Sequence, residues 1–538
     1  MRQPGKISLI SAAEAAALVK AGDVLAVGGN GGSGVPETVL EALEQRFLDN
    51  GGPGGLTLLH VTGIGAVTEH GLCRLAHPGL VARVFGGNFG LQMPFMKRIR
   101  TGEIEGYNFP QGVMAQLFRA MAGKQPGVIT HVGLGTYMDP RQDGARMNER
   151  TTEPMVELVE LAGREWLFYR APTPSVAFIR GTSADEDGYV SMEHEATTRE
   201  DLSIAQAVHN AGGIVICQVK RLVKRGSQNP HMVKIPGFLI DHFVLVPDQM
   251  QTYATQYDPS RCGETTIPVS SLTPDPLTER RVIARRGAFQ LRSGDVINLG
   301  VGISAMIPNV VAEEGMDEMM TLTVESGVVG GVPGYAREFG TAYNPRAILD
   351  QAYQFDFYDG GGLDCAFLSF AEVDGDGNVN VTRFGDRYDG SGGFINISQN
   401  ARRLVFSGSL TGGGLDVAVE SGRLAIRSEG KFRKFVPDVG QVSFNGRLAR
   451  ERGQDVIYIT ERAVFRLEAD GLALAEIAPG VRLKEDVIDQ VGFPLRVDPG
   501  VKLMDPRIFR PGPMGLREDI LDGAVGGTGP ALRLVGER

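Results

Sequence analysis

The chain carries the same sequence pattern twice, at a fixed spacing. Residues 21–39, AGDVLAVGGNGGSGVPETV, align with residues 293–311, SGDVINLGVGISAMIPNVV, at an offset of 272 (293 − 21). Two further pairs follow in the same order: TLLHVTG (57–63) with TLTVESG (321–327), and AFIRGTSADEDGYV (177–190) with AFLSFAEVDGDGNV (366–379). The strand–glycine–helix pattern common to α/β proteins explains one such match. Three matches in order predict an internal duplication.

Each copy has the pattern of a buried strand, a glycine-containing turn and a helix. The apolar runs at 24–27 and 296–299 have the length of buried strands. Pro36 and Pro308 then suit the first turn of a helix. Strands that alternate with helices are typical of a largely parallel sheet. We therefore expect an α/β protein of two tandem, related open-sheet domains fused in one chain.

The length of 538 residues agrees with more than one domain. Proline and serine cluster in PVSSLTPDPLTERR (268–281), shortly before the second copy begins, as is typical of a linker. The sequence therefore predicts an N-terminal domain at 1–272, a C-terminal domain at 273–515 and a C-terminal tail at 516–538.

The first glycine loop has the spacing of a dinucleotide-binding motif. Gly29, Gly31 and Gly34 satisfy G-x-G-x-x-G. That motif also needs an acidic residue at the end of the next strand, for the ribose. Here the strand ends in Thr62 and Gly63. The loop therefore predicts free backbone amides that suit an anion, without the features of an NAD site.

The two copies differ at the end of one strand. Where the first copy has Val61, the second has Glu325 (325 − 61 = 264, the offset of that pair). Open α/β sheets bind ligands at the carboxyl ends of their strands. The carboxylate of Glu325 is therefore the leading candidate for a functional group that only the second copy has.

The sequence around Glu325 resembles that of family I coenzyme A transferases. The motif is TVESGVVGGVPG (323–334), and the segments at 133–148, 351–385 and 390–408 are similar to the long, fused branch of that family. This branch includes the propionate and short-chain acyl-CoA:acetate CoA-transferases. The similar segments extend from residue 22 to about 515. The family's two halves share one open α/β fold, which agrees with the duplication.

The resemblance implies a covalent, ping-pong mechanism. Glu325 would attack an acyl-CoA, and a glutamyl–CoA thioester would pass CoA to a second acid of the acetate, propionate or 3-keto type. It implies no metal and no cofactor, with coenzyme A as a substrate.

Other residues match the family around this nucleophile. Each attack creates an oxyanion that needs hydrogen-bond donors. The resemblance assigns these donors and the substrate contacts to two glycine loops and two amide side chains: Gly300, Gly302 and Ile303; Gly392 and Gly393; Asn298 and Gln111. Tyr335 and Arg337 replace small residues of relatives, so we expect them to flank the acyl pocket.

Two alternatives remain open from the sequence. An acyl-CoA hydrolase would use the same glutamate with water as the acceptor. A non-catalytic ligand-binding protein could use the same type of fold, although the glutamate motif argues against that function.

The composition restricts the partners. A formal net charge of −10 argues against nucleic acid or an anionic membrane surface. No apolar run reaches membrane-spanning length, and the four cysteines are scattered. We expect a cytoplasmic protein, and the resemblance implies a homo-oligomer, either a dimer or a tetramer.

Overall fold

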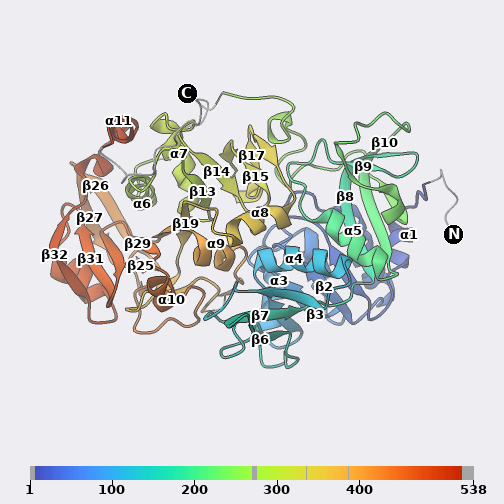
Figure 1. The fold of residues 1–538 in the computed structure, drawn as a ribbon, viewed down its shortest axis with the longest axis horizontal. Coiled ribbons are helices and arrows are strands. Elements are labelled where there is room, and N and C mark those ends of the chain that lie inside the picture. The colour runs from blue at the N-terminus through green and yellow to red at the C-terminus, as the bar shows by residue number, and fades with distance from the viewer. Residues whose placement is uncertain (1–6, 269–275, 335, 386, 524–538) are drawn as a thin grey trace.

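The structure is a computed structural model that describes residues 7–268, 276–334, 336–385 and 387–523. Figure 1 shows the N-terminal half, in blue to green, on the right and the C-terminal half, in yellow-green to red, at the centre and left. Each half is built on its own large sheet. The predicted boundary between residues 272 and 273 lies outside the described residues. Among the helices that are described, none is long and apolar enough to cross a membrane.

The sheet of the N-terminal half is parallel through seven neighbouring strands. Its order is β12 (His242–Leu245), β10 (Ile214–Val223), β8 (Val176–Asp185), β1 (Val24–Val27), β2 (Leu56–His60), β3 (Val81–Gly86) and β4 (Glu105–Asn108). Its helices are α1 (Ala12–Ala17), α2 (Glu37–Asn50), α3 (Met93–Arg100), α4 (Gln111–Ala122) and α5 (Asp201–Asn210). The short strand β9 (Val190–Ser191) pairs antiparallel with β8 near its end, and β11 (Val233–Ile235) pairs with β9. The strands β5 (Gly127–Thr130), β6 (Val156–Leu161) and β7 (Arg164–Arg170) form a separate small sheet.

The sheet of the C-terminal half has a parallel centre, and the extensions on its two sides are antiparallel except for the last pair of strands at one edge. The parallel strands are β14 (Thr321–Val324), β13 (Val296–Leu299), β19 (Cys365–Ser369), β24 (Arg403–Ser407) and β29 (Asp455–Ile459). On one side follow β15 (Val328–Val329) and β18 (Ala347–Ile348), and on the other β30 (Ala463–Glu468), β31 (Gly471–Ile477) and β32 (Arg496–Leu503).

Shorter elements complete this half. Its helices are α6 (Glu279–Ala288), α7 (Ile307–Glu313), α8 (Gln351–Asp359), α9 (Phe394–Asn400), α10 (Gly446–Glu451) and α11 (Leu516–Leu521). The two-residue strands pair as β16 (Val332–Pro333) with β17 (Ala342–Tyr343), β20 (Glu372–Val373) with β21 (Val379–Asn380), β22 (Arg383–Phe384) with β23 (Arg387–Tyr388), and β25 (Thr411–Gly412) with β28 (Phe432–Arg433). The hairpin of β26 (Asp416–Glu420) and β27 (Arg423–Ser428) is longer.

The strand registers confirm the duplication. In β1 and β2, Val24 lies opposite Thr57, and in β13 and β14 Val296 lies opposite Thr321. These partners are related by the offsets 272 and 264 that the sequence alignment uses. The third pair agrees, since β1 pairs β8 as β13 pairs β19, residue for residue at the aligned positions. Because a slip of one residue would reverse every side chain, this agreement places aligned residues on the same face of each sheet.

The halves diverge immediately after β2 and β14. In the first half the next strand, β3, continues the sheet in parallel. In the second half the chain reverses after Glu325, and β15 returns antiparallel to β14. Gly327 makes this reversal with φ +103°, and an added Cβ there would lie 2.1 Å from the carbonyl oxygen of Leu349. Glu325 is therefore fixed in a tight reversal at the carboxyl end of β14.

The last described residues pack against the second hydrophobic core. Ile508, Leu516 and Ile520 are buried there. The backbone amides of Met514 and Leu516 donate to the Glu314 carboxylate at 2.5 and 2.9 Å. The expected tail thus begins with a docked helix, and residues 524–538 lie outside the described residues.

Candidate active site

Glu325 lies where the buried strand β14 ends. Its Oε2 is buried and has no hydrogen-bond partner among the described residues. Burial raises the pKa of this carboxyl to about 7, while its own backbone and the Asn298 side chain lower the pKa by smaller amounts. A carboxylate that is poorly solvated and only partly ionised at neutral pH is more reactive than one in water, so this environment suits a nucleophile.

Asn298 stands beside Glu325 on the neighbouring strand β13. The side chain is fully buried, and Oδ1 has no partner among the described residues. Its Nδ2 donates to the hydroxyl of Tyr358 on α8 at 3.2 Å. Ala26 occupies the equivalent position in the first half. Two polar residues, Asn298 and Glu325, therefore replace two apolar ones in the C-terminal half alone.

The three predicted residues of the loop after β13, Gly300, Gly302 and Ile303, differ in whether their backbone amides are already hydrogen-bonded. The Gly300 amide donates to the Phe367 carbonyl at 2.8 Å, so it is occupied within the sheet. Gly302 adopts φ +84°, and in the part of the chain that is described the amides of Gly302 and Ile303 donate no hydrogen bond. The neighbouring Val301 is 58% exposed. The amides of Gly302 and Ile303 are thus the ones available to bind an anion.

The equivalent loop of the first half is filled by side chains. An added Cβ would lie 2.1 Å from Asp201 at Gly28, 2.6 Å from Tyr253 at Gly32 and 2.0 Å from Arg199 at Gly34. The whole loop from 28 to 35 is buried. The glycines are therefore required by close packing, and the space that a dinucleotide would need is occupied.

The structure brings Gln111 and the Gly392 loop together across the two halves. The amide of Gln111 donates to the Gly392 carbonyl at 2.9 Å, and the amide of Gly112 donates to Asn396 at 3.1 Å. The Gly392 amide in turn donates to the carbonyl of Gly87 at 2.7 Å. The Gly392 amide is therefore already used in a hydrogen bond that joins the two halves. The Gly393 amide donates no hydrogen bond among the described residues.

The loop after the nucleophile motif lies between the two halves. Ser326 donates to the carbonyl of Gly340 at 2.5 Å, and an added Cβ at Gly340 would lie 3.1 Å from Asn30 of the first glycine loop. Arg337 belongs to a short helical turn in this loop, with an exposed side chain. Tyr335 lies outside the described residues. Their place at the acyl pocket stays a prediction.

A buried arginine anchors this loop to the first half. Arg261, only 1% exposed, pairs with Glu338 and donates to Thr341 at 2.7 Å. Its guanidinium also stacks over the ring of Tyr343 at 3.9 Å. The position of the loop beside Glu325 therefore depends on residues of both halves.

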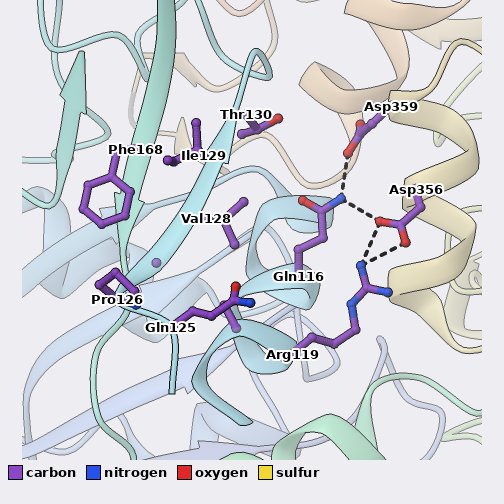
Figure 2. A pocket seen from close by; sticks show the side chains of 12 residues that line it. Gln116, Arg119, Gln125, Pro126, Val128, Ile129, Thr130, Phe168, Asp356 and Asp359 are labelled. Carbon is purple, nitrogen blue, oxygen red and sulfur yellow. Dashed lines mark hydrogen bonds and ion pairs between the residues drawn. The ribbon is translucent and has the colours of Figure 1, made fainter. Parts of the chain in front are cut away.

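A cavity of about 740 Å³ lies away from Glu325, between α4, β5 and α8. Figure 2 shows Gln116 and Arg119 of α4 pointing at Asp356 and Asp359 of α8. Arg119 contacts both oxygens of Asp356, at 2.8 and 2.9 Å. Glu325 does not line this cavity, so it is separate from the candidate active site.

Sequence reasoning missed the buried face of α8. Gln351, Gln354, Phe355 and Tyr358 lie on that face, and the Tyr358 hydroxyl lies close enough to Glu325 to be influenced by its charge. The spacing of these residues along the helix was a usable signal. The sequence could not show that this face of α8 packs against β13 and β14, because these segments lie far apart in the chain.

Known proteins of one family are similar to this chain. Residues 9–245 match the coenzyme A transferase family. The acetate CoA-transferase YdiF of Escherichia coli K12 is 43% identical over 514 residues, which cover 95% of this chain and 97% of that protein. The caffeate CoA-transferase of Acetobacterium woodii is 42% identical over 508 residues, 93% of this chain and 97% of that protein.

Solved structures of the YdiF acyl-CoA transferase from E. coli O157:H7 are also similar. The apoenzyme has a TM-score of 0.92 at 42% identity, covering 96% of this chain and 98% of the other. A thioester complex of the same enzyme with CoA has a TM-score of 0.91 at 42% identity, covering 96% and 99%. These similarities show that this chain of two fused α/β halves is a CoA-transferase. The chain belongs to the coenzyme A transferase family.

Proposed function

We propose that this enzyme transfers CoA from an acyl-CoA to a short-chain carboxylic acid, with Glu325 as the covalent nucleophile. The observation that carries the proposal is the environment of Glu325. Its carboxyl stands at a strand end with one oxygen buried and unpartnered, and its pKa is raised to about 7. The similarity to transferases of acetate and caffeate supports a carboxylic acid as the acceptor.

In the first half-reaction, the Glu325 carboxylate attacks the thioester carbonyl of the donor. The C–S bond breaks, which gives an acyl–glutamyl anhydride and the CoA thiolate. The thiolate then attacks the glutamyl carbonyl, and the first acid leaves as its carboxylate. The product is a glutamyl–CoA thioester, and no net proton is consumed.

In the second half-reaction the acceptor reverses these steps. Its carboxylate attacks the glutamyl–CoA carbonyl and expels the thiolate, which then attacks the acceptor's carbonyl in the new anhydride. The new acyl-CoA leaves, and Glu325 is a carboxylate again. Every attack places negative charge on a carbonyl oxygen, and we assign the amides of Gly302 and Ile303, in the loop that follows β13, and the Asn298 side chain on β13 as its donors.

Steady-state kinetics with Glu325→Gln test this proposal. The exchange removes the nucleophile with little change in shape, so transfer should fall by at least about 10³-fold. The wild-type enzyme should show parallel lines in double-reciprocal plots at several acceptor concentrations, because the first acid leaves before the second binds. Full transfer by Glu325→Gln of verified mass would contradict the proposal.

The proposal includes the oligomeric state and the cellular location of the enzyme. We expect a homo-oligomer, dimer or tetramer, in the cytoplasm, on the strength of the family resemblance. Light scattering on the purified protein and fractionation of cells test these two expectations.

A further inference from the structure

A chain of hydrogen bonds runs from the neighbour of Glu325 into the sheet. Asn298 donates from Nδ2 to the Tyr358 hydroxyl at 3.2 Å, and Tyr358 donates to Thr323 Oγ1 at 2.8 Å. Thr323 then donates to the backbone carbonyl of Ile297 at 2.8 Å. All three side chains are buried, with at most 2% exposed.

The last member of this chain fixes the direction of every hydrogen bond in it. A carbonyl oxygen only accepts hydrogen bonds, so Thr323 donates its one hydroxyl proton to the Ile297 carbonyl. Thr323 must then accept from Tyr358, which leaves the Tyr358 oxygen to accept from Asn298. Asn298 therefore turns its NH₂ end, and not its oxygen, toward this side of the site.

The same amide lies beside Glu325, because Asn298 is on β13 and Glu325 directly follows β14, the strand that pairs with β13. The nearby Asn298 side chain lowers the pKa of the Glu325 carboxyl, as a donor directed toward the carboxylate would. Meanwhile the Asn298 oxygen stays buried without a partner among the described residues. A buried amide oxygen without a hydrogen bond is unfavourable, so contacts with neighbouring residues must hold the Asn298 amide in this orientation.

We propose that Tyr358 is a positioning residue of the transfer reaction, holding the Asn298 amide with its NH₂ end toward Glu325. In that orientation the amide donates to the oxygen of the glutamyl carbonyl, where negative charge develops each time this carbonyl is attacked. Turned by 180°, the amide would present its oxygen to the same charge. The inference rests on the proposed role of Glu325.

Two further observations support this role. Burial raises the pKa of the Tyr358 hydroxyl, so the residue keeps the proton that it donates to Thr323. The first half lacks the hydrogen-bond chain, since Ala26 and Leu59 occupy the positions of Asn298 and Thr323. The chain therefore accompanies the nucleophile and is not a general requirement of the duplicated fold.

The test compares Tyr358→Phe with Tyr458→Phe. Tyr458 is an equally buried tyrosine of the same half, whose hydroxyl donates to the Gly377 carbonyl at 2.6 Å. Each change removes one buried hydroxyl and keeps the ring. We expect Tyr358→Phe to lower kcat/KM at least about tenfold and to move the acidic limb of the pH profile to higher pH, because Glu325 loses an oriented donor. Tyr458→Phe should stay within about twofold.

A double-mutant cycle separates positioning from a general structural effect. If Tyr358 acts through Asn298, Tyr358→Phe should cost less than about twofold in the Asn298→Ala background. An activity of Tyr358→Phe within twofold of the wild type would overturn the proposal, as would an equal loss in both backgrounds. Glu325→Gln is assayed beside these variants to test the two hypotheses separately. Transfer by Glu325→Gln would contradict the role of Glu325 as the nucleophile, whatever the result for Tyr358.

Discussion

Glu325 occupies the position in the second half of the chain that Val61 occupies in the first. The registers of β1 with β2 and of β13 with β14 match residue for residue at the aligned positions, and both residues follow directly from these strands. One scaffold thus carries an apolar strand end in one half and a reactive carboxyl in the other.

The acidity of Glu325 predicts how the rate depends on pH. Attack needs the carboxylate, and burial raises the pKa of this group to about 7. The rate of the first half-reaction, followed by stopped-flow release of the first acid, should therefore rise with pH through about 7 and level off above it. A rate that is already maximal at pH 5.5 would mean that Glu325 is ionised far more easily than its surroundings imply.

The same raised pKa predicts a cost in stability. The folded pKa of about 7 exceeds the ordinary value of 4.5, so the associated stability is fully present below pH 4.5 and is lost as the pH rises through 7. The loss approaches about 3 kcal/mol well above pH 7. Glu325→Gln should therefore melt at a higher temperature than the wild type at pH 8, and the difference should shrink toward pH 5.

A surface carboxyl provides the control for this measurement. The Glu420 side chain is 60% exposed and pairs with the exposed Arg427 at 2.7 Å. Glu420→Gln should leave the melting temperature nearly unchanged at both pH values, because such pairs contribute little. If both variants behave alike, the effect does not come from the burial of Glu325.

The filled glycine loop predicts a difference between two glycines with the same backbone conformation. Gly34 (φ +67°) would place a Cβ 2.0 Å from Arg199, whereas Gly22 (φ +78°) has nothing within 4 Å. Gly22→Ala should cost about 1 kcal/mol from backbone strain alone. Gly34→Ala should destabilise the protein by a further 2 kcal/mol or more, roughly, or prevent folding. Equal melting temperatures would show that the loop has more room than the structure gives it.

The loop between the halves predicts a change in selectivity. Arg337 is exposed in the turn Ala336–Glu338, twelve residues after Glu325 in the sequence, and Tyr335 is two residues before Arg337. If these residues flank the acyl pocket, Tyr335→Ala and Arg337→Ala should change the kcat/KM ratio between acetate and a larger acid by more than about twofold. Ratios that stay constant across a set of acceptors would remove both residues from the pocket.

The proposed chemistry uses carboxylates and a thiolate, with backbone and amide donors at the oxyanions. It therefore predicts that no metal or cofactor is required. Dialysis against EDTA should leave kcat unchanged when CoA esters and acids are the only additions. A loss of activity that Mg²⁺ or Zn²⁺ restores would contradict this prediction.

Much of the fold could be predicted because it depends on local pattern and on the repeat. The apolar run at 24–27 forms β1 as expected, and the S-x-x-E pattern of Ser11 and Glu14 forms a capping box at the start of α1. In the third repeated segment, each copy turns at its Asp-Gly pair, with Gly188 and Gly377 in the left-handed region. Local sequence determines each of these features, so the pattern was sufficient.

The details of the site needed contacts between distant segments. The first glycine loop could not be seen to be filled, because Arg199, Asp201 and Tyr253 lie more than 150 residues further along the chain. The sequence likewise could not show that the Gly300 amide is occupied by Phe367 on a neighbouring strand. The hydrogen-bond chain through Tyr358 depends on how α8 docks, which no local pattern encodes.

Mass spectrometry of the enzyme after reaction with a donor shows directly whether Glu325 carries CoA during turnover. The enzyme is incubated with an acyl-CoA in the absence of an acceptor, digested under mildly acidic conditions and mapped by mass spectrometry. We expect the free acid to be released and a CoA adduct to form on the peptide that contains TLTVESGVVGG (321–331). Addition of acetate should then remove CoA from this peptide. An adduct on another residue, or complete turnover with no adduct formed at any time, would contradict this role of Glu325.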